Sequence, residues 1–126
     1  MLIIDSNEVE EITAGDNTLL RELLSPYKDG IDKNRKIRIR YSLAHARVQP
    51  GNMSYKHKLT SSEIYYILEG VGEMHIDDES EEVLPGQAIY IHPEAVQYIK
   101  NTGTGDLVFL CIVDPAWKSE DEELVD

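Results

Sequence analysis

The sequence predicts an all-β protein, folded as a sandwich or barrel in a single domain. Between about residues 41 and 113, short apolar and β-branched runs are separated by turns of Gly, Pro, Asn and Asp at close intervals. This stretch shows almost no helical periodicity. The whole chain of 126 residues has the length of one domain. Many short strands with Gly and Pro turns are typical of a two-layered β fold.

The N-terminal segment, residues 1–35, is expected to contain one short amphipathic helix. Asp16, Asn17 and Thr18 have side chains that can cap a helix. Leucines follow at positions 19, 20, 23 and 24, and Ser25-Pro26 would end the helix. The helix is therefore predicted over about residues 19–24.

The barrel is predicted over residues 36–115. Its first strand begins at Lys36, where Ile37, Ile39 and Tyr41 alternate with basic residues. Further strands are expected at 41–48, 63–68, 73–76, 87–91, 96–99 and 107–113. The acidic stretch 77–82 is interpreted as a turn, and the acidic tail 116–126 as a solvated end without a role.

The strand that begins at Glu63 is apolar on both faces. Ile64, Tyr65, Tyr66 and Ile67 follow one another, whereas a sheet with one solvated face needs apolar residues only at every second position. A second sheet can cover one face, and a second copy of the chain or the N-terminal helix can cover the other; symmetric dimerisation is the commonest way to bury such a surface. We therefore expect a homodimer.

Composition and charge exclude several classes of partner. The formal net charge of −12 disfavours binding to nucleic acid or to an anionic membrane surface. No apolar run approaches the roughly 18 residues of a membrane span, and no signal peptide is evident, so a cytoplasmic location is expected. The single cysteine, Cys111, excludes an intramolecular disulfide and is interpreted as a buried core residue. Half of the basic residues lie between positions 28 and 40 and are interpreted as protecting an edge strand.

Two segments carry a family resemblance. In the first, Gly51 is followed by His57, Glu63 and Gly70 at spacings that resemble the first motif of the cupins. In the second, the segment from Pro85-Gly86 to Asn101-Thr102-Gly103 is similar to the second cupin motif. The resemblance implies one cupin domain over residues 1–126, folded as a double-stranded β-helix, or jelly-roll barrel.

The resemblance also implies a divalent metal, but the ligand set is incomplete. Cupins typically bind the metal through two histidines and a glutamate of the first motif and a histidine of the second. His57 and Glu63 occupy two of these positions, whereas Leu59 and Gln97 occupy the other two. Leu59 cannot bind a metal, and the side-chain oxygen of Gln97 is a neutral, weak ligand. His45 could supply a further nitrogen, or it could be a surface or core histidine.

The spacing favours a shared cavity without deciding what fills it. Residues 57 and 59 lie on one face of a strand, and Glu63 and Tyr65 can meet them inside a barrel. One nitrogen and two oxygens, from His57, Glu63 and Gln97, suit Mn²⁺, Fe²⁺, Ni²⁺ or Zn²⁺. Alternatively, the histidine and the glutamate pair with each other, with Gln97 capping them, and no metal binds.

Further side chains are expected to line the ligand pocket. Arg47 is the candidate for binding a carboxylate or a phosphate, and tyrosines can orient a small polar ligand. With Leu59, the predicted pocket residues are Arg47, Tyr55, Leu59, Tyr65 and Tyr90.

Three functions are compatible with these features. The first is a small cupin that binds a small polar molecule in its barrel, through a weak divalent metal site. The second is a sugar-phosphate isomerase, because single-domain cupins resemble the barrel of the phosphomannose isomerase group. The third is a non-enzymatic, metal-free binding or sensor module.

Overall fold

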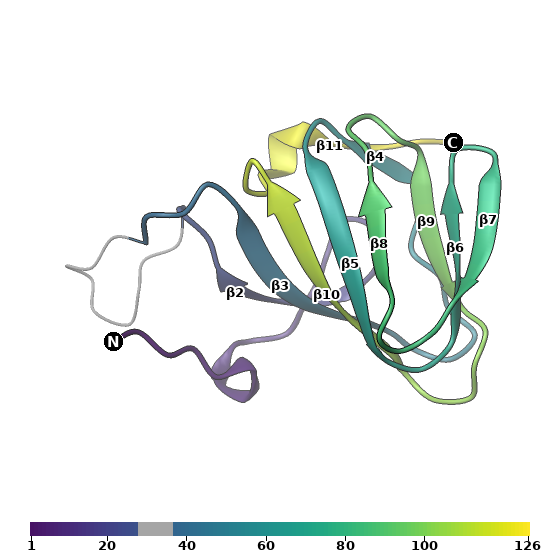
Figure 1. Ribbon diagram of the computed structural model, residues 1–126, viewed down its shortest axis with the longest axis horizontal. Coiled ribbons are helices and arrows are strands. Elements are labelled where there is room, and N and C mark those ends of the chain that lie inside the picture. Colours follow the sequence, from purple (N-terminus) through teal and green to yellow (C-terminus); the bar gives the residue numbers. More distant parts are fainter. Residues whose placement is uncertain (28–36) are drawn as a thin grey trace.

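The computed structural model describes residues 1–27 and 37–126, which form an antiparallel β-sandwich with jelly-roll layers. The strands are β1 (Ile12–Thr13), β2 (Leu19–Leu24), β3 (Ser42–Val48), β4 (His57–Leu59), β5 (Ser62–Glu69), β6 (Gly72–Ile76), β7 (Glu79–Val83), β8 (Ala88–Ile91), β9 (Gln97–Asn101), β10 (Leu107–Asp114) and β11 (Glu122–Leu124). One sheet has the order β1-β2-β3-β10-β5-β8 and the other β11-β4-β9-β6-β7. Figure 1 shows the two sheets facing each other. The predicted all-β barrel is confirmed.

The core lies between the two sheets because each inner strand buries every second side chain. On β3, Ala44 and Ala46 face inward, and their small side chains leave room for the aromatic rings of the neighbouring strands. Phe109 on β10 and Tyr65 on β5 contact each other with ring centroids 4.5 Å apart. Met74 and Ile99 complete the core from the second sheet.

The helix expected over residues 19–24 is a strand, β2. It pairs antiparallel with β3, with Leu19 opposite Arg47 and Leu20 opposite Ala46. The leucine pattern suits either structure, and pairing along an open edge of the sheet favours the strand because the edge supplies hydrogen-bond partners. Asp16 therefore stabilises the turn between β1 and β2 instead of capping a helix. Among residues 1–27, the one helical element is a short 3₁₀ turn, Ser6–Glu8.

Two further expectations are corrected. Residues 37–41 form no strand, and β3 begins at Ser42; Lys36 lies outside the described residues, as does most of the basic cluster. The acidic stretch 77–82, predicted as a turn, contains most of strand β7, which pairs with β6. Four of the five β7 residues are exposed, so this edge strand lacks the apolar alternation by which strands are recognised in a sequence.

The acidic tail is also part of the fold. Strand β11 pairs antiparallel with β4, and Leu124 lies opposite His57. The expectation of a solvated end without a role is therefore wrong for residues 122–124. This pairing brings the C-terminal strand to the residue that the sequence singled out as a candidate ligand.

Steric constraints explain why position 70 is a glycine. Its φ angle of +86° lies in the left-handed region, and a Cβ atom there would lie 2.5 Å from the backbone oxygen of Asp106. The turn after β5 therefore requires glycine, which explains the last residue of the first motif.

Candidate functional site

A cavity lies inside the barrel, where the turn between β1 and β2, strand β4 and strand β11 meet. About 50 Å³ of it can hold the centre of a water molecule, within a hollow of about 560 Å³ that is partly open to solvent. The hydrophobic part of its lining includes Leu59, Tyr65, Phe109, Cys111 and Trp117. Its acidic and imidazole groups are Asp16, Glu22, His57, Glu63 and Glu122.

His57 is held in one orientation. Its side chain is 2% exposed, and its Nδ1 atom lies 2.7 Å from the backbone oxygen of Tyr55. Because a carbonyl oxygen only accepts hydrogen bonds, Nδ1 carries the proton and donates it. The other ring nitrogen, Nε2, faces Asp16 Oδ2 at 3.5 Å. The ring thus directs Nε2 towards a carboxyl group.

Asp16 reaches the cavity from the turn between β1 and β2. Its Oδ1 atom accepts hydrogen bonds from the backbone N–H of Thr18 at 3.1 Å and from the Thr18 hydroxyl at 2.7 Å. The backbone N–H of Tyr55 donates to the carbonyl oxygen of Asp16 at 2.7 Å. These bonds attach the turn to the segment before β4 and leave Asp16 Oδ2 directed at His57.

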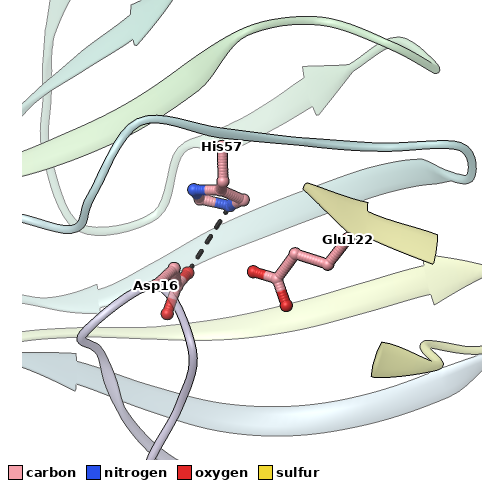
Figure 2. Close-up of side chains that lie close together, drawn as sticks. All are labelled: Asp16, His57 and Glu122. Atoms are coloured by element: carbon pink, nitrogen blue, oxygen red, sulfur yellow. Dashed lines mark ion pairs between the residues drawn. The ribbon is translucent and has the colours of Figure 1, made fainter. Parts of the chain in front are cut away.

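Glu122 completes the cluster from β11. Its Oε2 atom accepts a hydrogen bond from Trp117 Nε1 at 3.1 Å. One atom from each of Asp16, His57 and Glu122 lies within 4.8 Å of the other two, and Figure 2 shows the three side chains converging from three separate segments. Burial and the nearby charge of Asp16 raise the pKa of Glu122.

Glu63 belongs to a separate network in the same cavity. Gln97 Nε2 donates to Glu63 Oε1 at 3.0 Å, and the Tyr65 hydroxyl donates to Gln97 Oε1 at 3.1 Å. Burial raises the pKa of Glu63 to about 8, because a charged carboxylate is poorly solvated there. Glu63 is therefore mainly protonated at neutral pH. Burial likewise raises the pKa of Tyr65.

The four positions at which cupins bind a metal do not fit one here. Leu59 places a buried hydrocarbon side chain at the second position. The Gln97 oxygen already accepts from Tyr65, its nitrogen donates to Glu63, and Glu63 is a neutral acid. The structure thus separates the predicted trio: Glu63 and Gln97 bind each other, whereas His57 faces Asp16 and Glu122.

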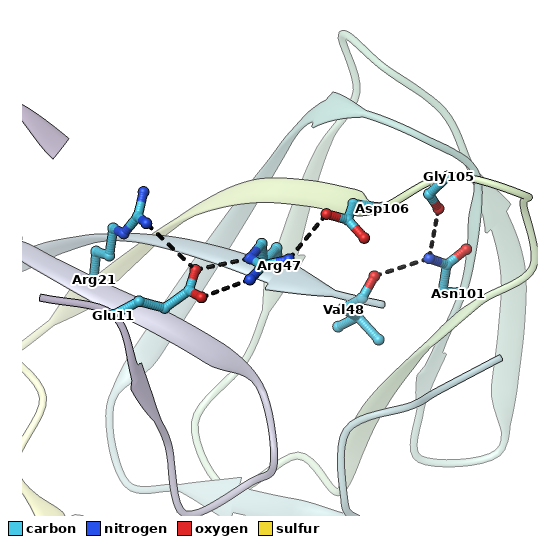
Figure 3. Close-up of polar contacts among 7 residues, drawn as sticks. All are labelled: Glu11, Arg21, Arg47, Val48, Asn101, Gly105 and Asp106. Atoms are coloured by element: carbon cyan, nitrogen blue, oxygen red, sulfur yellow. Dashed lines mark hydrogen bonds and ion pairs between the residues drawn. The ribbon is translucent and has the colours of Figure 1, made fainter. Parts of the chain in front are cut away.

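Arg47 and His45 lie on the opposite face of β3 from the inward-facing alanines of that strand. The Arg47 guanidinium donates to both oxygens of Glu11, at 2.6 and 2.8 Å, and to Asp106 at 3.0 Å (Figure 3). Arg47 thereby lowers the pKa of Glu11. Close by, Asn101 donates to the carbonyl oxygens of Val48 and Gly105. Arg47 therefore ties the N-terminal segment to the barrel and does not point into the cavity.

Of the predicted pocket tyrosines, one lines the cavity and two have exposed side chains. Tyr65 lies inside the cavity, as does Leu59. Tyr55 and Tyr90 have exposed side chains, 53% and 64%, so Tyr55 contributes to the site only through its backbone. Cys111 is buried, as predicted, and burial raises the pKa of its thiol.

Asp16, Glu122 and Trp117 are the site residues that sequence reasoning missed. Asp16 was interpreted as a helix cap, and Glu122 as one charge in a solvated run. The apolar pair Leu124-Val125 directly after the acidic run is the one local signal that the tail could pair with a sheet.

None of the helices among the described residues has the length and apolar character that a membrane crossing requires.

Comparison with known proteins agrees with the fold. A family model described as the cupin domain matches residues 44–113. The uncharacterized protein MJ1618 of Methanocaldococcus jannaschii is 38% identical over 123 residues, covering 95% of this chain and 91% of that protein.

Solved structures show the same architecture. A protein described as a predicted oxalate decarboxylase of Thermotoga maritima is 25% identical, with a TM-score of 0.73 over 90% of this chain and 99% of its own. Rru_A2000 of Rhodospirillum rubrum, a cupin-2 domain, is 17% identical, with a TM-score of 0.74 over 94% of this chain and 76% of its own. Pac13, described as a nucleoside dehydratase, is 17% identical, with a TM-score of 0.75 over 99% of this chain and 91% of its own. The last two likenesses are evidence of the fold alone.

Proposed function

Because the chain belongs to the cupin family and has a polar cavity inside its barrel, we propose that it binds a compact, uncharged or cationic polar molecule there. The observation that carries this proposal is the lining of the cavity. Hydrogen-bonding groups of His57, Glu63 and Asp16 line it beside the rings of Tyr65 and Phe109. A few polar groups set in an apolar wall are typical of a small-molecule site.

The size of the cavity supports a compact ligand. A site needs roughly 10–15 Å³ of this kind of space for each water molecule, so about 50 Å³ corresponds to roughly three to five waters. A molecule of about four non-hydrogen atoms fills the same space. Larger molecules would have to extend into the part of the hollow that is open to solvent.

The charge of the lining supports a ligand without negative charge. Four carboxyl groups line the cavity, whereas none of the described lining residues is a lysine or an arginine. A bound anion would therefore be repelled by Asp16 and Glu122 without a compensating cation. The sugar-phosphate isomerase alternative needs such a cation, and Arg47 is already paired with Glu11 and Asp106.

Three small probes test this proposal: 2-aminoethanol and ethylene glycol, with four non-hydrogen atoms each, and glycolate, with five. The chain has one tryptophan, and Trp117 lines the cavity, so its fluorescence should report occupancy. Titrations in the presence of EDTA exclude a contribution from metal ions. We expect saturable changes with the cationic and the neutral probe, and at least about tenfold weaker binding of the anion.

The matched variants are Ala44→Leu, which should fill the cavity, and Ala88→Leu at an exposed position of β8. Binding should be lost in Ala44→Leu and retained in Ala88→Leu. Glycolate binding as tightly as 2-aminoethanol, or binding that survives Ala44→Leu, would contradict the proposal. So would the absence of a saturable response to all three probes.

A further inference from the structure

We infer that Asp16, His57 and Glu122 form a divalent-cation site, which shares only His57 with the metal positions of the cupin family. The inference goes beyond the proposed function, because a cation can bind these three side chains without any organic ligand. The inference rests on three observations: three ligand atoms converge, neighbouring groups orient them, and two of the three side chains are carboxyl groups.

The separations suit a common metal ion. His57 Nε2 and Asp16 Oδ2 are 3.5 Å apart, and the Glu122 carboxylate has an oxygen within 4.8 Å of both. Two ligands about 2.1 Å from a tetrahedral Zn²⁺ ion lie about 3.4 Å apart. The pair His57–Asp16 therefore already has the spacing of two ligands on one ion, and Glu122 needs only a side-chain movement to join them.

Each ligand is oriented through its other polar atom. The Tyr55 carbonyl accepts the Nδ1 proton of His57, Thr18 donates twice to Asp16 Oδ1, and Trp117 donates to Glu122 Oε2. Residues that bind metals are usually held in this way by a second layer of hydrogen bonds, which fixes the tautomer and the direction of the free lone pairs. In this cluster, the second layer leaves Nε2 and Asp16 Oδ2 facing each other.

The charge of the cluster calls for a cation. The Nε2 atom of His57 and the oxygens of the two carboxyl groups lie close together, and none of the described residues that line the cavity is a lysine or an arginine. A divalent ion can balance the charge of two carboxylates and accept the lone pair of an imidazole nitrogen. These three groups also come from the N-terminal turn, β4 and β11, so a bound ion would join both ends of the described chain to the barrel.

The donor set identifies the class of ion. One imidazole nitrogen and two carboxylate oxygens suit first-row transition metals such as Mn²⁺, Co²⁺ and Zn²⁺. Mg²⁺ and Ca²⁺ prefer sites built from oxygen alone. Among these ions the affinity should rise from Mn²⁺ through Co²⁺ to Zn²⁺.

The test is calorimetric titration of EDTA-treated, dialysed protein with Zn²⁺, Mn²⁺ and Mg²⁺, for the wild type and three isosteric variants. We expect one equivalent of Zn²⁺, weaker Mn²⁺ and no Mg²⁺ binding. Asp16→Asn and Glu122→Gln should weaken Zn²⁺ binding at least about 100-fold. Glu63→Gln should leave Zn²⁺ binding unchanged, because Glu63 belongs to the other network. Co²⁺ added to the wild type should give the visible absorption of a nitrogen- and oxygen-ligated ion.

Several outcomes would overturn the inference. Loss of Zn²⁺ binding in Glu63→Gln with retention in Glu122→Gln would place the ion at the family positions. Absence of Zn²⁺ binding to the wild type would mean that the three side chains do not form a metal site. If Asp16→Asn fails to fold, Glu122→Gln decides alone, since Glu122 is only partly buried and Gln keeps the acceptor for Trp117. The probe titrations in EDTA decide the proposed function separately.

Discussion

The buried carboxyl group of Glu63 should make the stability of the protein fall as the pH rises. Burial raises the pKa of Glu63 to about 8 from an ordinary value of 4.5. Between these two values the folded protein binds a proton that the unfolded chain releases, so ionisation favours the unfolded chain. Substitution by Gln keeps the shape and the acceptor for Gln97 but has no charge to lose.

The expected magnitude follows from the two pKa values. Between pH 5 and pH 9, Glu63 alone should lower the free energy of unfolding of the wild type by about 4 kcal/mol. Urea unfolding at several pH values, with EDTA present, measures this for the wild type and for Glu63→Gln. The difference between the two proteins should grow by about that amount with rising pH, since the other titrating groups are common to both.

An exposed carboxyl on the same strand provides the control. Glu69→Gln should follow the pH dependence of the wild type, because Glu69 is exposed in both the folded and the unfolded chain. Parallel pH profiles for the wild type and Glu63→Gln would refute the conclusion that Glu63 is protonated in the folded protein.

Three further predictions concern the frame around the cavity. Arg47→Ala should lower the free energy of unfolding by about 1–2 kcal/mol, because two carboxylates lose their partner. The variant should leave the Trp117 response to 2-aminoethanol unchanged. Weaker probe binding would contradict the placement of Arg47 outside the cavity. Gly70→Ala should cost at least about 2 kcal/mol in urea unfolding, and a neutral effect would argue against the tight turn. In light scattering, the wild type should have twice the mass of one chain, and the Tyr66→Lys variant should have the mass of one chain. The reason is that Tyr66 lies on the exposed apolar face of β5. A monomeric wild type would contradict the expected homodimer.

The fold could be predicted because its evidence is local. Strands β3, β5, β6, β8, β9 and β10 each show short apolar runs between turn residues. The two motifs then place these strands in the order of a cupin barrel. Strand β2 was missed because its paired leucines suit a helix equally well. What decides between them is the open edge of β3, which lies outside the segment itself.

The site could be predicted only in part, because half of it comes from the ends of the chain. His57 and Glu63 were found through their motif spacing, and both line the cavity. Asp16 and Glu122 reach it only because a hairpin and a terminal strand fold back onto the barrel. Near Asp16 nothing in the sequence records its pairing, and near Glu122 the one local signal is the apolar pair Leu124-Val125. The metal-free alternative was a pair of His57 with Glu63, capped by Gln97; the structure has the contact between Glu63 and Gln97, whereas His57 faces Asp16.

The nitrogen chemical shifts of the His57 ring test the central claim most directly, namely that His57 presents its Nε2 atom to Asp16 and Glu122. In EDTA-treated protein, Nδ1 should carry the proton, and Nε2 should shift on addition of Zn²⁺ in the wild type and in Glu63→Gln but not in Glu122→Gln. A proton on Nε2 with a bare Nδ1, or a Zn²⁺-induced shift that depends on Glu63 instead of Glu122, would contradict the account.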